Sequence, residues 1–285
     1  MVQRYDNREA SSFYRRAACA LVMTVAVALG ACSSSDKDEL EDTTPADQLY
    51  NQGLAYSNAG EYSKAAKKFE ELDRVHPYSG YARKSLIMSA YTNYTSGRFQ
   101  EAINAGRRYA TLFPGDPDAA YALYIVGQSY FKQIPDVTRD QEMTERALQA
   151  MKSVVDKYPE SEYADDARKK ILITNDQLAG KEMEVGRYYL KKRDYIGSIN
   201  RFRLVVTNYQ TTRHVEEALA RLTECYYSLG VVSEAKTAAA VLGHNYPESR
   251  WYKDAYALLQ KGGYEPEEDQ GSWISKAFAN APKLL

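Results

Sequence analysis

The residues of this chain that could carry out covalent or metal chemistry are few and far apart. Its 285 residues include three cysteines and three histidines, at Cys19, Cys32, Cys225, His76, His214 and His244. The histidines have none of the paired spacings of zinc proteins, such as HExxH, and the sequence contains no CxxC pair. It also lacks the GxGxxG and GxSxG patterns of nucleotide-binding loops and nucleophile elbows. The sequence therefore predicts a protein that is not an enzyme and that holds no metal ion or other cofactor.

The surroundings of Cys32 indicate a different kind of chemistry, the attachment of lipid. Arg15 and Arg16 precede a run of 13 uncharged residues, from Ala17 to Leu29, which has the layout of a secretory signal. This run is shorter than the ~20 apolar residues that a membrane-spanning helix needs. The segment Leu29-Gly30-Ala31-Cys32 resembles the bacterial lipobox, a signal in which the cysteine sulfur is diacylated and the chain is cut before it.

Lipidation of Cys32 predicts a membrane anchor, because several acyl chains together hold a protein firmly on a bilayer. The next residue is Ser33 rather than an aspartate, which in such lipoproteins resembles sorting to the outer membrane. Two alternatives stay open at this point. The segment could be a plain secretory signal with an incidental cysteine, or a signal-anchor helix.

Cleavage before Cys32 divides the chain into a signal peptide, residues 1–31, and a mature protein that begins with a polar, acidic tether, residues 32–45. The signal peptide carries a net charge of +2 while the whole chain carries −1, which leaves −3 on the mature protein. A basic excess that would indicate nucleic-acid binding is therefore missing. Cys225 is the one other cysteine of the mature protein, and its apolar neighbours at helical spacing favour a buried thiol.

The mature protein contains a repeated pattern of small residues and prolines. Three stretches share a glycine (Gly60, Gly97 and Gly230), an alanine five residues later, and a proline seventeen residues after the glycine. The small residues let two helices approach closely, and the proline ends the second helix because its ring cannot continue one. This pattern resembles the tetratricopeptide repeat, a unit of 34 residues that forms two antiparallel helices.

Five units in a shared phase predict an all-α fold, a tetratricopeptide-repeat solenoid of five repeats in which each repeat buries its apolar face against its neighbours. A surplus near residues 161–178, between the third and fourth units, is expected to extend the connecting helix. The repeat domain spans residues 46–260 and is followed by a C-terminal tail, residues 261–285. The repeats are expected at residues 46–79, 83–116, 120–161, 179–212 and 216–249.

The first helix of each repeat is expected to face a concave groove, and the groove-facing positions of the first three repeats are rich in aromatic residues. Tyrosine offers a large apolar area and a hydroxyl group at little entropic cost, which suits peptide recognition. We expect a substrate-peptide groove made of Tyr50, Tyr91, Tyr94, Tyr121, Tyr124 and Phe131, with Lys84 or Lys132 placed to meet a terminal carboxylate. Alternatively, these rings serve packing alone, or another helix or the tether fills the groove.

Three longer stretches carry a resemblance to a known family. They read ELDRVHPYSGYARKSLIMSAY, YPESEYADDARKKI and LAGKEMEVGRYYLKKRDYIGSINRFRLVV. With the lipobox and the displaced third and fourth units, they resemble the BamD family, also called the competence-lipoprotein family. The segments GKEMEVGRYYL and AAAVLGHNYPESRWY look like its alphaproteobacterial branch, and the resemblance covers about Cys32 to Gln260.

This resemblance implies a non-enzymatic lipoprotein on the periplasmic face of the outer membrane, within the machinery that assembles β-barrel proteins. The partners it implies are the periplasmic POTRA domain of the large assembly subunit, other assembly lipoproteins, and unfolded outer-membrane proteins recognised through their C-terminal signal. In the family, an arginine in the fourth repeat contacts that POTRA domain. The corresponding residue here is Arg201, with Arg203 as a helper.

Two other functions are compatible with parts of this sequence. A repeat lipoprotein could act as a scaffold that links the outer membrane to peptidoglycan or to the division machinery, and the proteins that co-purify with it would distinguish this role. A lipoprotein enzyme would need a compact pocket with converging carboxylates or a Ser/His pair. The repeats leave little of the chain for such a pocket.

Overall fold

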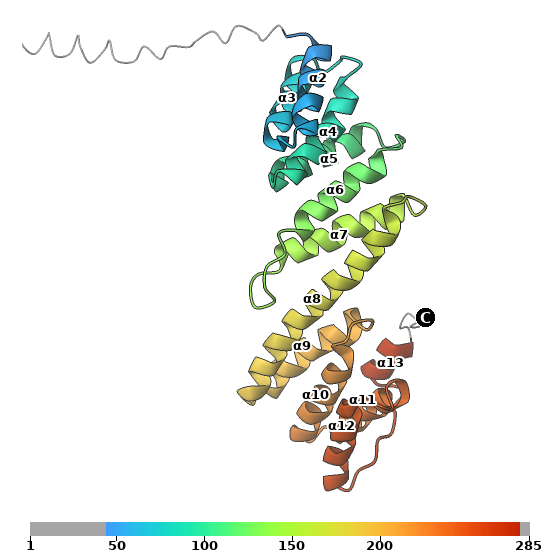
Figure 1. Cartoon of the computed structure of the whole chain (residues 1–285). Helices are drawn as coiled ribbons and strands as arrows, with labels where there is room; N and C mark the ends of the chain where they lie inside the picture. Colours follow the sequence, from blue (N-terminus) through green and yellow to red (C-terminus); the bar gives the residue numbers. More distant parts are fainter. Residues whose placement is uncertain (1–43, 280–285) are drawn as a thin grey trace, which may run out of the picture. The chain divides into compact units, whose positions relative to one another are not determined.

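The computed structural model describes residues 44–279, and every regular element in this range is an α-helix (Figure 1). The prediction of an all-α fold is therefore confirmed. The helices are α2 (Ala46–Asn58), α3 (Tyr62–Val75), α4 (Ala82–Thr95), α5 (Phe99–Leu112), α6 (Ala119–Phe131), α7 (Glu142–Lys157), α8 (Ala164–Lys191), α9 (Tyr195–Asn208), α10 (Val215–Ser228), α11 (Val232–Asn245), α12 (Arg250–Lys261) and α13 (Trp273–Ala279).

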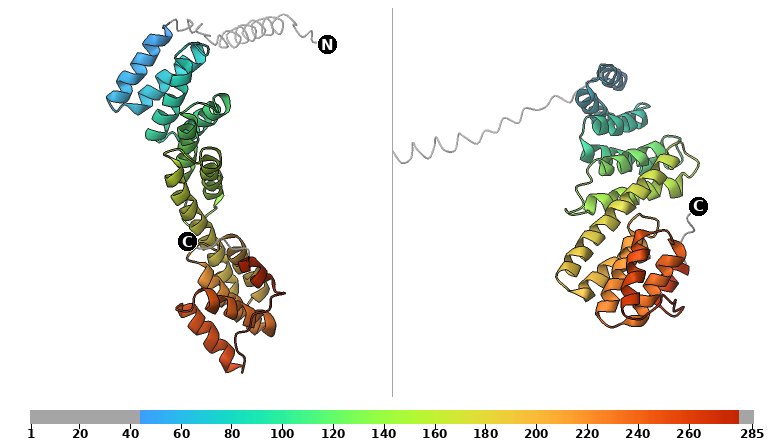
Figure 2. Two further views of the ribbon diagram at one scale, coloured as in Figure 1. Left: turned by 90° about the vertical axis from the view of Figure 1, so that its right-hand side faces the viewer. Right: turned by 60° about the horizontal axis from the view of Figure 1, so that its bottom comes forward.

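Pairs of helices follow one another along the described chain and account for the predicted repeats. The pairs are α2–α3, α4–α5, α6–α7, α8–α9 and α10–α11, and each helix from α2 to α11 packs against the next one (Figures 1 and 2). Each pair thus shares an apolar interface with its neighbours, as the repeat pattern requires.

The turn inside four of these pairs needs a residue in the left-handed region of backbone conformation. Gly60, Gly97 and Gly230 occupy it with φ of 75°, 80° and 75°. Glycine adopts this conformation without steric cost because it has no Cβ atom. Arg193 takes the same place between α8 and α9 with φ of 60°, so the fourth repeat keeps the turn without the glycine.

Glycines on the first helices make room for large side chains of the second helices. A Cβ atom on Gly53 would lie 2.6 Å from the ring of Phe69, which is fully buried. Gly186 meets the ring of Phe202 in the same way, and Gly127 meets the side chain of Met151. These contacts fix how closely the two helices of a repeat approach each other.

Helix α8 is the longest of the described helices, with 28 residues. Its first turns pack with α7 in a cluster that includes Met151, Val154 and Ala167, whereas its last turns join the cluster that contains Met183 and Phe202. The prediction that the surplus between the third and fourth units extends a helix is confirmed. This one helix therefore packs against the third repeat at its start and contributes to the core of the fourth and fifth repeats at its end.

The segment expected as a C-terminal tail, residues 261–285, contains α13. Helix α12 packs against α10 and α11, after which the chain returns so that α13 packs against α9 and α11 (Figure 1). Ile274 of α13 is fully buried in the cluster formed by these helices. This part of the tail is therefore packed against the fourth and fifth repeats.

Candidate peptide-binding surface

The aromatic residues predicted on α4 and α6 lie on one shared apolar base. Tyr91, Tyr94 and Tyr121 are partly buried and pack against a cluster that includes Ala90 and Ile125. Each of these side chains is thus partly exposed and partly held against the core. Side chains of this kind offer apolar area whose conformation is already fixed.

The surface continues from α6 to the beginning of α8. The rings of Tyr121 and Tyr124 both lie against the ring of Tyr163, with centroid distances of 5.1 and 5.0 Å. Tyr163 caps the N-terminus of α8 and is partly exposed. It was not among the predicted groove residues, although the stretch YPESEYADDA, in which it stands, parallels the residues that precede α4.

A charged network borders this surface at α8. Tyr124 donates a hydrogen bond to the carboxylate of Asp166 and accepts one from the amide of Gln128, while Lys170 pairs with the same carboxylate. The Lys170 ammonium also lies 5.9 Å from the ring centroid of Tyr124 and 5.5 Å from that of Phe131. Phe131 therefore joins the surface through a cation that it shares with Tyr124.

Burial governs the protonation of these groups. Burial, followed by the nearby hydroxyl groups of Tyr91 and Tyr94, raises the pKa of Tyr121 to about 12. Burial and the hydrogen bond to Asp166 raise the pKa of Tyr124, and burial followed by Glu162 raises that of Tyr163 to about 12. At neutral pH these phenols are therefore uncharged and can donate hydrogen bonds.

The carboxylate of Asp166 stays charged beside these phenols. Its burial favours the neutral form, but the hydrogen bonds from Lys170 and Tyr124 outweigh this effect and lower the pKa of Asp166. The border of the surface thus holds one fixed cation and one fixed anion. We name the six rings of Tyr91, Tyr94, Tyr121, Tyr124, Phe131 and Tyr163 the aromatic surface.

The three other predicted groove residues take different places. Tyr50 packs between Phe69 and Tyr81, with ring centroids at 5.8 and 5.3 Å, on the first repeat. Lys84 on α4 and Lys132 at the end of α6 are exposed. The lysine that lies against the aromatic surface is instead Lys170, whose side chain is only 16% exposed.

The two arginines predicted to bind the large subunit face different neighbours. The Arg201 guanidinium pairs with the Glu182 carboxylate of α8 at 3.2 Å, and its side chain remains 40% exposed. The Arg203 guanidinium lies 4.8 Å above the ring of Trp273 in α13. Two residues apart on a helix point to different sides, so the structure does not bring these arginines together on one face.

Of the two remaining cysteines, the structure describes Cys225 but not Cys32. Cys225 is fully buried, which confirms the prediction of a buried thiol, and burial raises the pKa of this thiol to about 12. Cys32, the predicted lipidation site, lies outside the described residues.

Between residues 44 and 279, no cluster of three or more His, Cys, Asp or Glu side chains is arranged to hold a metal ion. None of the helices in the same range is both long enough and apolar enough to cross a membrane.

Three known proteins resemble this chain over most of its length. Outer membrane protein assembly factor BamD of Caulobacter vibrioides is 45% identical over 248 residues, which cover 87% of this chain and 81% of that protein. The protein of the same name from Rickettsia prowazekii is 40% identical over 239 residues, or 84% and 95% of the two chains. BamD of Neisseria meningitidis serogroup A is 33% identical over 250 residues, or 83% and 94%.

A family model for outer membrane lipoproteins, YfiO, matches residues 42–242, a range that contains the whole aromatic surface and both arginines. The solved structure of MamA covers 74% of this chain at 15% identity with a TM-score of 0.36, a likeness too weak to bear on function. The identities to the BamD proteins and the family match lead to one assignment. The chain belongs to the YfiO family of outer membrane lipoproteins, together with these BamD proteins.

Proposed function

We propose that this protein is a non-enzymatic, lipid-anchored component of the machinery that assembles β-barrel proteins in the outer membrane. The relatives at 45% and 40% identity carry the name of outer membrane protein assembly factor, and the matching family is one of outer membrane lipoproteins. In this proposal the lipid is attached to Cys32, and the repeats face the periplasm.

The aromatic surface is the proposed binding site for unfolded outer-membrane proteins, and it is the observation that carries this function. Six partly buried rings follow one another over the first helices of three consecutive repeats. An extended peptide with alternating apolar side chains and a terminal aromatic residue could bury its rings against them. Each well-buried aromatic side chain contributes ~1.5–3 kcal/mol from its area alone.

Lys170 is a candidate for contact with the free carboxylate at the end of such a peptide. An ammonium group has three hydrogen-bond donors, and the pairing with Asp166 uses part of this capacity. The side chain of Lys170 is held over the rings of Tyr124 and Phe131, so its position is fixed before the peptide binds. Lys84 and Lys132 remain the alternatives that the sequence suggested.

Arg201 is the proposed contact with the POTRA domain of the large assembly subunit. Its guanidinium is partly exposed and has a planar set of donors that can hold an acidic side chain with two hydrogen bonds. The Asn-Arg step in which the family resemblance places this arginine is present at Asn200 and Arg201. Other assembly lipoproteins would join the same complex.

Titration of a peptide from the C-terminus of a barrel protein tests the substrate site. We expect binding in the micromolar range, about −8 kcal/mol, because ordering of the peptide offsets much of the apolar gain. The double variant Tyr91→Ala/Tyr124→Ala should lose affinity by about tenfold or more, with unchanged helix content by circular dichroism.

Tyr78→Ala is the matched control, since this tyrosine is fully exposed and lies outside the aromatic surface. It should bind the peptide as the wild type does. Equal affinity of the double variant and the control would contradict the proposed site, as would crosslinks of the peptide only to the fourth and fifth repeats. The rings would then serve packing alone.

A further inference from the structure

Two sets of three helices in this chain have the same lengths and the same spacing along the sequence. When 133 is added to the residue numbers that bound α3, α4 and α5, the results are the bounds of α9, α10 and α11. The left-handed turn residues obey the same shift, because Gly60 corresponds to Arg193 and Gly97 to Gly230. Residues 133 positions apart therefore occupy equivalent places in the two sets.

The C-terminal segment of the chain covers one side of the second set. The backbone N–H of Asp269 donates to Thr237 Oγ1 at 3.1 Å, and the hydroxyl of Ser272 donates to the carboxylate of Glu234 at 2.7 Å. Both acceptors belong to α11. They hold the residues that immediately precede α13.

Trp273 is the first residue of α13 and fixes it to the other two helices. Its indole N–H donates to the hydroxyl of Tyr226 on α10 at 3.1 Å, and its ring lies under the guanidinium of Arg203 on α9. The next residue, Ile274, is fully buried. We call this site the covered groove.

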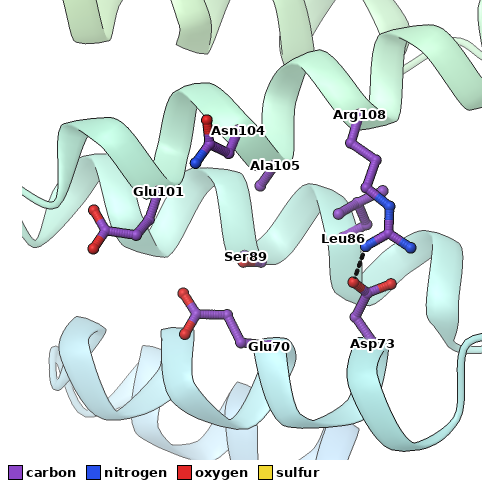
Figure 3. Close-up of a pocket in the computed structure, with 8 residues that line it drawn as sticks. All are labelled: Glu70, Asp73, Leu86, Ser89, Glu101, Asn104, Ala105 and Arg108. Atoms are coloured by element: carbon purple, nitrogen blue, oxygen red, sulfur yellow. Dashed lines mark hydrogen bonds and ion pairs between the residues drawn. The ribbon is translucent and has the colours of Figure 1, made fainter.

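A cavity of about 250 Å³ lies at the equivalent place in the first set, between α3, α4 and α5. Figure 3 shows Glu70 and Asp73 of α3 on one side and Glu101, Asn104 and Arg108 of α5 on the other. We call this cavity the N-terminal pocket. It differs from the aromatic surface in that the second helices of the repeats form its walls.

The N-terminal pocket keeps the two acceptors that hold the chain in the covered groove. Glu101 corresponds to Glu234, and Asn104 corresponds to Thr237. A carboxylate and an amide oxygen can thus accept from a hydroxyl group and a backbone N–H placed as those of Ser272 and Asp269 are. The base also stays apolar at one position, because Leu86 corresponds to Leu219.

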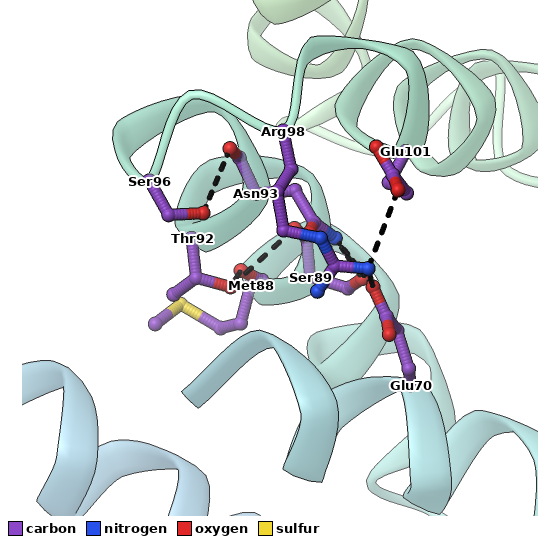
Figure 4. Close-up of polar contacts among 8 residues, drawn as sticks. All are labelled: Glu70, Met88, Ser89, Thr92, Asn93, Ser96, Arg98 and Glu101. Atoms are coloured by element: carbon purple, nitrogen blue, oxygen red, sulfur yellow. Dashed lines mark hydrogen bonds and ion pairs between the residues drawn. The ribbon is translucent and has the colours of Figure 1, made fainter. Parts of the chain in front are cut away.

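The pocket differs from the covered groove at the place of Trp273. Glu70 stands where Arg203 lies over the indole ring, and Asn93 stands where Tyr226 accepts from the indole N–H. The Asn93 amide donates to Glu70 at 2.8 Å, yet its buried Oδ1 atom has no hydrogen-bond partner, and only 1% of the residue is exposed (Figure 4). The Glu70 carboxylate lines the pocket and favours a cationic donor over an aromatic ring at this place.

The balance of charge leads to the same preference. Arg98 pairs with Glu70 at 3.3 Å and with Glu101 at 3.5 Å, and Arg108 pairs with Asp73 (Figures 3 and 4). Three carboxylates therefore face two guanidinium groups around the pocket. One further positive charge would neutralise the site.

We propose that the N-terminal pocket is a docking site for a short helical segment of a partner protein. The segment enters as α13 enters the covered groove, with a hydroxyl or backbone N–H donor before its first turn that Glu101 and Asn104 accept. It carries Lys or Arg at the position of Trp273, where the Glu70 carboxylate receives the cation. This site lies apart from the aromatic surface and does not depend on what that surface binds.

Two labelled peptides test this proposal on the full chain in detergent. One has the sequence of residues 268–279, EDQGSWISKAFA, and the other carries the substitution Trp273→Lys. The lysine peptide should bind about tenfold more tightly, as expected for one charged hydrogen bond. Glu70→Gln, which keeps the side-chain volume, should abolish this preference.

The double variant Glu101→Gln/Asn104→Ala should weaken both peptides about tenfold, whereas Glu248→Gln, an exposed carboxylate elsewhere, should change neither. Circular dichroism confirms that the variants are folded. Failure of the lysine peptide to bind, equal binding of both peptides, or indifference to the double variant would overturn the proposal. Loss of binding in Glu234→Gln alone would also overturn it, since the peptide would then be displacing α13 from the covered groove.

Discussion

Arg201 is held by Glu182 within the chain but keeps two fifths of its side chain exposed. Exposed ion pairs contribute only ~0–1 kcal/mol to folding, so this residue can be changed without large loss of stability. Arg201→Glu should release the large assembly subunit, because it removes the cation and adds a repelling charge. Co-purification from solubilised membranes measures this release, and circular dichroism measures the helix content.

The matched control for Arg201 is Glu182→Gln. This variant breaks the same ion pair within the chain but leaves the guanidinium in place. It should therefore retain the large subunit. If both variants lose the partner equally, the geometry of α8 and α9 matters rather than a direct contact of Arg201.

Asp116 illustrates a carboxylate whose charge supports the fold. It accepts from the backbone N–H of Asp118 at 3.0 Å and from the hydroxyl of Tyr109 at 2.8 Å, which lowers the pKa of Asp116 below its usual 3.8. A depressed pKa adds stability that is present above pH 3.8 and is lost as the pH falls through the lower, folded-state value. Asp116→Asn should therefore lower the melting temperature at pH 7.

The pH dependence of this difference is the decisive measurement for Asp116. The gap in melting temperature between wild type and Asp116→Asn should narrow as the pH is lowered below 3.8. A gap that stays constant down to pH 2 would mean that shape, rather than charge, makes the aspartate necessary. Asp156→Asn, an exposed carboxylate on α7, should show no gap at either pH.

At the scale of elements, the approach of α8 and α9 depends on Gly186. A Cβ atom there would collide with the ring of Phe202, which is fully buried. Gly186→Ala should therefore destabilise the protein by ~1–3 kcal/mol, the typical cost of overpacking a core. Urea unfolding measures the change, and Gly80→Ala is the control, since a Cβ atom on Gly80 meets no other atom within 4 Å. An unchanged midpoint for Gly186→Ala would show that the helices can separate without cost.

The helix pairs could be predicted from the sequence because their determinants are local. The turn needs a residue such as Gly60, Gly97 or Gly230 at a fixed spacing, and the packing needs small residues opposite large ones. The same repeat spacing predicts that Tyr91, Tyr94, Tyr121 and Tyr124 lie on the first helices of their repeats, and there the structure shows them partly buried.

The remaining features could not be predicted, because they depend on contacts across long stretches of chain. Tyr163 joins the aromatic surface, and Lys170 borders it, only because α8 begins before the displaced fourth unit. Trp273 donates a hydrogen bond to Tyr226, which lies 47 residues earlier in the sequence, and Trp273 stands in a segment that lacks the repeat pattern. A repeat pattern predicts contacts between neighbouring repeats, but it does not predict a segment that folds back over the repeats.

At the scale of the whole molecule, the proposed role requires that the repeats stay at the membrane surface through Cys32. A cysteine-linked set of acyl chains gives stable anchoring, because each buried CH₂ contributes ~0.8 kcal/mol. Cys32→Ala should therefore give protein that is either unprocessed or released from the outer membrane. Cell fractionation together with mass measurement of the N-terminus distinguishes these two outcomes.

Protein contacts complicate this measurement, because a variant without lipid could still be retained by the large subunit. Washing the membranes with alkaline carbonate removes proteins held only by such contacts, so Cys32→Ala should leave the membrane at this step while the wild type stays. Cys225→Ala is the matched control, since that thiol is fully buried among the helices of the fifth repeat, and this variant should stay in the membrane as the wild type does. If Cys32→Ala is still processed and resists the wash, the anchor lies elsewhere, and the proposed attachment of the repeats to the membrane is wrong.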